Sequence, residues 1–414
     1  MPANSFAYDA ATRHARLDIH DPTFYRDPFA VYAELHRHGP AFFWEELGQW
    51  YVIGYDAVNG LLRDRRFGRQ ILHVATREEL GMAEPKPHLA DFDAVEAHSL
   101  LGLEPPAHTR LRTLVNRAFV SRQIEQLRPG IGALCHELID DFQGAGHIEL
   151  LKAYAEVIPV TIIARMLGIP VAMGDKLLEW SHAMVRMYVF NPPYEHEVAA
   201  NRASAEFADY LRGVIAEKRA KPGDDLMTHM VTTEKDGERL SDDELISTAV
   251  LLLNAGHEAT VHQIGNAVNT ILSHEADPKA LFADARSTSL AVEECMRFAA
   301  PLHNFDRFAL SDIDLGDDIV LKKGEQIGLM LAAANVDPAK FTDAAAFRPD
   351  RDEAPHLSFG AGLHFCIGAP LARLELNIAL PILFERLPGL RLAEPPAVRD
   401  SFHFHGMERV DLVW

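Results

Sequence analysis

Apolar residues recur every three or four positions through much of the middle of the chain. This spacing predicts amphipathic helices, because residues three and four apart lie on one helical face. Shorter stretches alternate or turn in the way that small strands do. The clearest helical stretches are residues 29–39, 158–170, 175–188 and 205–220, and the clearest strand-like ones are 48–54, 313–327 and 404–414. The pattern predicts a mainly α-helical fold with a small β region.

The longest predicted helix begins at Ser241 and continues to about Ser273. Its start carries a capping box, in which Ser241 and Glu244 cap each other's backbone amides. Gly256 lies inside this helix, where glycine costs about 1 kcal/mol relative to alanine. We therefore expect another group to approach the backbone closely at Gly256, although a packing glycine in a buried helix is the simpler reading.

Length and composition predict a large globular protein. The chain has 414 residues, of which 48% are hydrophobic, enough for a sizeable core. We expect a single domain over residues 1–414, with a small β-rich part at about 1–70 plus late strands and a large helical part at about 71–386. Only three cysteines occur, without paired spacing, so neither disulfides nor a zinc site is predicted.

The formal net charge of −20 argues against nucleic acid as a partner, because binding phosphates needs an excess of Lys and Arg. One basic segment, residues 107–122, contains four arginines and no acid. It reads either as a solvated helix face or as a region that binds anions. The first residues lack a signal-peptide pattern, and no apolar run approaches the 18 or so residues that a membrane span needs. We expect a cytoplasmic protein without a membrane anchor.

The strongest chemical signal is the stretch 359–368, which reads FGAGLHFCIG. Its glycines let the backbone approach a flat ligand, and Cys366 stands just before a predicted helix, whose amino end stabilises negative charge. The helix contains Pro381, which should kink or end it. A cysteine as sole protein ligand suggests haem, whereas a buried cysteine in a glycine-rich turn is the ordinary alternative.

This stretch resembles the F-x-x-G-x-x-x-C-x-G-x-x-L-A-R loop of the cytochromes P450. The matching positions are Phe359, Gly362, Cys366, Gly368, Leu371, Ala372 and Arg373. The resemblance implies a triangular helical prism that holds haem b between the long central helix and the helix after the cysteine. It also implies that Cys366 binds the iron and that Phe359 and Gly368 belong to the cofactor-binding loop. Thiolate ligation favours O–O cleavage and hydroxylation of unactivated C–H bonds.

In the family, an A-G-x-acid-Thr-Thr pattern forms the oxygen-binding groove, and residues 255–260, AGHEAT, resemble it. Gly256 and Glu258 match, but Ala259 stands where the usual threonine would donate a hydroxyl. Thr260 cannot simply replace it, because one residue rotates a side chain by about 100° around a helix. The missing donor is expected to be either a water held by Glu258 and Thr260 or a hydroxyl or carboxylate of the substrate.

The resemblance assigns further roles. It places His108, Arg112, Arg307 and His364 around the two haem propionates, which need charge-assisted donors. Glu294 and Arg297 match a structural E-x-x-R pair and share a helical face. A third charged partner usually precedes Phe347, but Ala346 occupies that position, so Arg348 or Arg351 is expected to substitute.

The resemblance also predicts a pocket for a lipophilic small molecule, such as a terpenoid, polyketide-like or aromatic compound. Its expected lining is Ile71, Val74, Met184, Met187, Leu253, Ala255, Leu302, Phe305 and Phe404. The expected electron donors are an iron–sulfur ferredoxin, or a flavodoxin, with an NAD(P)H-dependent reductase. Docking is expected on the basic face near Arg110, Arg117 and Arg122. A peroxide-driven peroxygenase and a haem-binding sensor or carrier are the competing functions.

Overall fold

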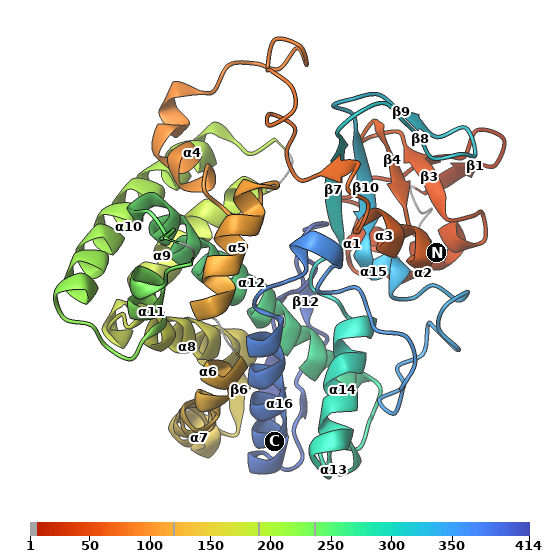
Figure 1. The fold of residues 1–414 in the computed structure, drawn as a ribbon. Coiled ribbons are helices and arrows are strands. Elements are labelled where there is room, and N and C mark those ends of the chain that lie inside the picture. The colour runs from red at the N-terminus through yellow and green to blue at the C-terminus, as the bar shows by residue number, and fades with distance from the viewer. Residues whose placement is uncertain (1–5, 119–120, 189–190, 236) are drawn as a thin grey trace.

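The computed structural model describes residues 6–118, 121–188, 191–235 and 237–414. Figure 1 shows a helical region beside a strand-rich region, with the C-terminal helix α16 in front of the long helix α12. Helices make up most of the described chain. Their bounds are α1 Pro22–Tyr25, α2 Pro28–His36, α3 Tyr55–Leu61, α4 Ala90–Glu96, α5 Ala107–Ala118, α6 Ser121–Gln126, α7 Arg128–Phe142, α8 Val157–Leu167, α9 Gly174–Val185, α10 Tyr194–Ala220, α11 Leu226–Thr232, α12 Asp242–Ser273, α13 Pro278–Leu281, α14 Ala285–Phe298, α15 Leu331–Ala334 and α16 Ala369–Arg386.

The largest sheet joins strands from both halves of the sequence. It has seven strands in the order β1-β2-β3-β4-β10-β7-β5, in which β10 runs parallel to β4 and antiparallel to β7. A three-stranded sheet, β11-β14-β6, ties the C-terminus to the middle of the chain. The strands are β1 Ala7–Asp9, β2 His14–Arg16, β3 Ala41–Trp44, β4 Gln49–Val52, β5 Phe67–Gly68, β6 His147–Glu149, β7 Asn304–Ala309, β8 Ile313–Asp314, β9 Val320–Leu321, β10 Gln326–Met330, β11 Arg391–Leu392, β12 Ala397–Val398, β13 Met407–Arg409 and β14 Asp411–Val413.

Helix α12 begins where the sequence predicts. Ser241 is its N-cap, and the Ser241 and Glu244 side chains form the capping box with each other's backbone. Three acidic residues in the first turn add favourable interactions with the helix dipole. The helix then runs for 32 residues through the molecule and packs against α8, α9, α14 and α16.

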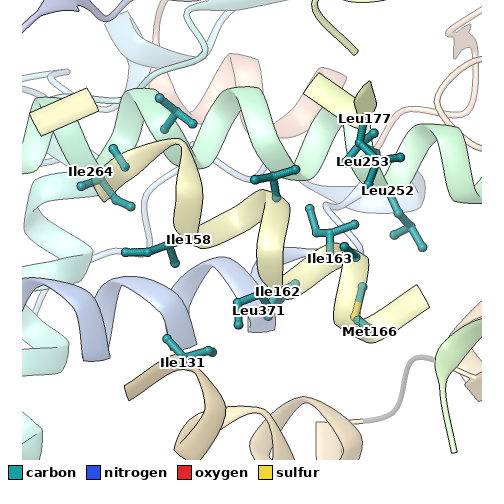
Figure 2. Packing of buried hydrophobic residues seen from close by; sticks show 14 of the residues in the cluster. Ile131, Ile158, Ile162, Ile163, Met166, Leu177, Leu252, Leu253, Ile264 and Leu371 are labelled. Atoms are coloured by element: carbon teal, nitrogen blue, oxygen red, sulfur yellow. The ribbon is translucent and has the colours of Figure 1, made fainter. Parts of the chain in front are cut away.

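The main hydrophobic core surrounds α12. Ile158, Ile162 and Ile163 on α8 lie between α12 and α16, and Leu253 of α12 lies beside Leu177 of α9 (Figure 2). Burying one such side chain contributes about 1.5–3 kcal/mol. This packing fixes α12 relative to α16. It therefore sets the position of residues 255–260 of α12 relative to the segment that contains Cys366.

The sequence predicts that Pro381 kinks or ends helix α16, but the helix does not end there. It continues to Arg386, and the Tyr154 hydroxyl donates a 2.9 Å hydrogen bond to the Ala379 carbonyl. Packing against the core therefore keeps the helix continuous where local propensity favours a break. Among the described helices, none combines the length and the apolar character needed to cross a bilayer.

Candidate active site

The segment around Cys366 is a tight loop held from several sides. The Cys366 amide donates to the Phe359 carbonyl at 3.0 Å, and Gly360 and Gly362 both have positive φ values. A Cβ on Gly362 would lie 2.5 Å from the Leu62 carbonyl oxygen, so only glycine fits at that position. The loop places Cys366 three residues before α16, and the residue is partly buried.

The ring of Phe359 is fixed by a cation. The Arg373 guanidinium lies 4.6 Å from its centroid and makes 2.6 and 2.9 Å hydrogen bonds to the Glu293 carboxylate. His356 contacts the same carboxylate at 3.1 Å. This brace joins the cysteine loop, α14 and α16, so the sulfur is held by a rigid support.

Two opposing effects set the pKa of the Cys366 thiol. Burial raises it, and this effect prevails. The amides of Gly368 and Ala369, which donate to the sulfur, and the charge of Arg112 act in the opposite direction. A thiolate formed by coordination to a metal would keep these donors.

Two of the four predicted propionate ligands are in direct contact. The rings of His108 on α5 and His364 in the short helix η6 (Gly362–His364) lie 4.5 Å apart. His108 is fully buried, yet neither of its ring nitrogens has a hydrogen-bond partner among the described residues. A buried imidazole without partners fits an anion that completes the site.

Arg112 and Arg307 supply the positive charge nearby. Arg112 Nη2 donates a 2.5 Å hydrogen bond to the Phe365 carbonyl of the cysteine loop. Arg307 on β7 is buried, and burial lowers its pKa to about 9. The donors together suit a group that combines a metal, bound by sulfur, with two carboxylates, which is the haem that the sequence predicts.

Arg69 and Glu104 belong to the same cluster and were not predicted from the sequence. The Arg69 guanidinium lies 4.6 Å from the Phe305 ring, and Arg307 lies 5.8 Å from the same ring. Glu104 Oε1 accepts the Arg69 amide at 2.5 Å and contacts His364 Nε2 at 3.2 Å. Both residues stand in loops without a motif, so no local signal marks them.

The middle of α12 exposes small side chains on one face. Ala255 is exposed and Gly256 and Ala259 are partly exposed, although His257 and Glu258 beside them are buried. Exposed small residues inside an otherwise buried helix indicate open space along that face. The close approach at Gly256 is explained by packing, because a Cβ there would lie 2.8 Å from Ile163 Cδ1.

Glu258 contacts two basic side chains. Its Oε1 accepts a 2.7 Å hydrogen bond from Arg399 Nη1 and lies 3.2 Å from His262 Nε2. Burial alone would raise the pKa of Glu258, but bonding to His262 and Arg399 outweighs it and holds the pKa well below its usual range. Thr260, one residue beyond Ala259, is buried.

The E-x-x-R residues form a buried ion pair. Arg297 makes hydrogen bonds of 2.7 and 2.8 Å to the Glu294 carboxylate. Arg351 is the third charged partner, with its Nε 3.2 Å from Glu294 Oε2. Arg348 contributes only its backbone amide, at 2.8 Å from Glu294 Oε1. Arg297 also donates to three carbonyls at 335, 344 and 346, which fastens α14 to the loop before Cys366.

The predicted pocket residues fall into two groups. Leu302 pairs with Phe404 through an isolated β-bridge, and Phe305 packs edge-on against His403 at 6.1 Å. Met184, Leu253 and Ile71 are buried, and their place in a substrate pocket stays a prediction. The remaining predicted positions keep exposure: Ala255 and Val74 are exposed, and Met187, Leu302, Phe305 and Phe404 are partly buried.

The predicted docking arginines are not all free. Arg110 makes ion pairs with Glu244 at 2.5 Å and Glu238 at 3.0 Å. Arg117 is exposed and donates to the Glu234 carbonyl at 3.2 Å. The side chain of Arg122 lies outside the described part of the structure.

Comparisons with known proteins identify the family of this chain. The family model described as Cytochrome P450 matches residues 70–276 and 286–391. Cytochrome P450 monooxygenase PikC of Streptomyces venezuelae is 38% identical over 90% of this chain and 87% of its own length. The 6-deoxyerythronolide B hydroxylase of Saccharopolyspora erythraea is 32% identical over 96% of this chain and 94% of its own.

Solved structures give the same result for the fold. P450BioI, in complex with an acyl carrier protein ligated to hexadec-9Z-enoic acid, superposes with a TM-score of 0.87 and 31% identity, covering 95% of this chain and all of its own. The bacillaene polyketide synthase P450 PksS of Bacillus subtilis superposes with a TM-score of 0.85, 30% identity and coverage of 96% and 99%. The cysteine loop, the bare face of α12 and these matches lead to one conclusion: the chain belongs to the cytochrome P450 family, has the P450 fold and is a monooxygenase that binds haem b.

Proposed function

We propose that this enzyme hydroxylates a lipophilic polyketide-like molecule, using dioxygen and two electrons from a ferredoxin and its reductase. The observation that carries the proposal is the braced cysteine loop, which holds the Cys366 sulfur at the amino end of α16. Bound haem supplies the oxidation chemistry that a thiolate ligand favours. In this proposal Cys366 would bind the iron, and His108, Arg112, Arg307 and His364 would bind the propionates.

The substrate class is argued from relatives and from the shape of the site. PksS of Bacillus subtilis is named as a polyketide biosynthesis cytochrome P450, and another relative is named as a hydroxylase of 6-deoxyerythronolide B. Ala255 and Ala259 leave space along α12, which suits a bulky substrate. Leu302, Phe305 and Phe404 offer apolar contact from β7 and the C-terminal turn. A terpenoid or an aromatic compound is the alternative substrate class.

Glu258, held ionised by Arg399 and His262, is proposed to order the water that delivers protons to the oxygen groove. Arg399 is partly exposed and bonds to Glu258, so it links the buried carboxylate to solvent. Ala259 offers no hydroxyl, and the missing donor is assigned to the substrate or to a water held near Glu258 and Thr260. The choice between these two donors is tested by comparing substrates with and without a hydroxyl group.

The electron donor is proposed to dock on the face that carries the cysteine loop. Leu363 and Phe365 are exposed apolar side chains of this loop, and Arg112 contacts the Phe365 carbonyl. Arg117 adds an exposed positive charge. Because Arg110 is already paired with Glu238 and Glu244, we assign it to internal support.

The test combines binding and turnover. Ferric holoenzyme is titrated with a macrolactone, a C16 fatty acid, a steroid and a monoterpene, and the change from low to high spin is followed by absorption. The macrolactone is expected to give the largest change and, with ferredoxin, reductase and NADPH, a product that contains one added oxygen. A spin change with the steroid or the fatty acid alone contradicts the polyketide assignment. Turnover with hydrogen peroxide but not with ferredoxin contradicts the electron-transfer assignment.

A further inference from the structure

Three side chains of metal-ligand type converge beside Glu258. His257 and Glu258 are neighbours on α12, and His182 comes from α9. One candidate ligand atom from each lies within 4.8 Å of the other two. Within the described ranges, this is the one group of three His, Cys, Asp or Glu residues that meets this criterion.

His257 is the residue that points to a ligand. It is 1% exposed, and neither of its ring nitrogens has a hydrogen-bond partner in the described part of the chain. Leaving a buried polar group without a partner is destabilising, so a buried imidazole normally has one. The ring of His182 lies 5.4 Å away, centroid to centroid, so it approaches His257 without a hydrogen bond between them.

The carboxylate of Glu258 has one oxygen to spare. Its contacts with Arg399 and His262 both end on Oε1, and Oε2 has no hydrogen bond among the described residues. Glu156, which precedes α8, interacts electrostatically with both His182 and Glu258. The carboxyl groups of Glu156 and Glu258 both act on this point, and the basic side chains of Arg399 and His262 contact Glu258 on its Oε1 side.

We propose that His182, His257 and Glu258 form a binding site for Zn²⁺, with water as the fourth ligand. Two imidazole nitrogens and one carboxylate oxygen are a donor set that zinc prefers. Zinc–ligand bonds of about 2.0–2.1 Å place tetrahedral ligands about 3.4 Å apart, so the ion draws the side chains together by about an ångström. His182 keeps contact with solvent and provides the entry for the ion.

Zinc binding has a consequence for catalysis that rests on the proposed role of Glu258. An ion on Oε2 holds the carboxylate in place and withdraws it from proton transfer. Binding itself does not depend on that role, on a substrate or on a redox partner. Failure of one claim is therefore distinguishable from failure of the other.

The test is a calorimetric titration of the ferric holoenzyme with ZnCl2, without substrate. We expect one strong site per chain, and a dissociation constant that rises at least tenfold in both His182→Ala and His257→Gln. His229→Ala on α11 is the control, because His229 pairs with exposed Asp224 away from this site. Zinc-edge X-ray absorption of the one-to-one complex is expected to show two imidazoles. Zinc binding that is unchanged in His182→Ala, or absence of a stoichiometric site, overturns the proposal. If His257→Gln fails to fold, partly exposed His182 still carries the test.

Discussion

Arg399 Nη1 donates a 2.7 Å hydrogen bond to Glu258 Oε1 across 141 positions of sequence. The bond joins a half-exposed residue near the C-terminus to a buried carboxylate in the middle of α12. It keeps Glu258 ionised, because together with His262 it outweighs the effect of burial on the pKa. Arg399, which lies outside the motif, thereby connects the buried Glu258 carboxylate to solvent.

Arg399→Gln is expected to destabilise the protein by at most about 3 kcal/mol at pH 7, because a hydrogen bond to a charged group contributes about 1.5–3 kcal/mol and the exposure of Arg399 reduces this. A depressed folded pKa contributes stability above the unfolded pKa, which is about 4.3 for Glu. This contribution disappears as the pH falls toward the folded pKa, so the difference between variant and parent should shrink below about pH 4. Urea unfolding at a series of pH values measures this difference in the free energy of unfolding. Arg409→Gln, which breaks an exposed pair with Asp411, should cost far less, because solvent screens such a pair. A constant Arg399 effect across pH contradicts the assignment.

Arg351→Met removes one partner of a buried carboxylate. Glu294 is 2% exposed, so the expected loss is about 3–5 kcal/mol in free energy of unfolding. Arg348→Met is a matched control, because the Arg348 side chain contacts only Asp343, at 3.7 Å, and Glu353, at 4.0 Å. Denaturant unfolding of both variants checks this. Equal losses in the two variants would show that Arg351 is not the third partner.

His108→Phe is expected to weaken haem retention without unfolding the protein. The lost donor to a propionate corresponds to about 1.5–3 kcal/mol, or about 10- to 150-fold faster haem loss. The measurement is the rate of haem transfer to an excess of apoglobin. His136→Phe, at an exposed position on α7, serves as the control. If both variants keep haem as the parent does, His108 does not contact the cofactor.

Ala259→Thr tests the missing hydroxyl donor. We expect a larger fraction of NADPH electrons in hydroxylated product and less peroxide, because threonine restores a donor in the groove. Ala255→Thr, four residues earlier on α12, places a hydroxyl one turn away and should not improve coupling. Product and peroxide yields per NADPH are the readout. Unchanged coupling in Ala259→Thr would show that this position does not control proton delivery.

Local signals in the sequence predict the parts of the fold that short-range chemistry determines. The capping box at Ser241 and Glu244 sets the start of α12, and the glycines around Cys366 set the loop. The P450 resemblance, the fold class and the haem cofactor are confirmed by the comparisons. These features need only residues close together in sequence.

Long-range packing decides the rest. The sequence left Arg348 and Arg351 as alternatives, and the contact with Glu294 distinguishes them only in three dimensions. Arg69, Glu104 and Arg399 carry no motif, because their partners lie on distant elements. Burial of Met184 and Leu253 likewise depends on how α9 meets α12, which helical periodicity alone does not define.

The central claim is that Cys366 is the thiolate ligand of haem iron. Its most direct test is the absorption spectrum of the reduced holoenzyme under carbon monoxide, beside Cys366→His as a control that should give a histidine-type band. We predict a strongly red-shifted Soret band for the parent protein. A parent band at the histidine-ligated position would contradict thiolate ligation and the proposed mechanism with it.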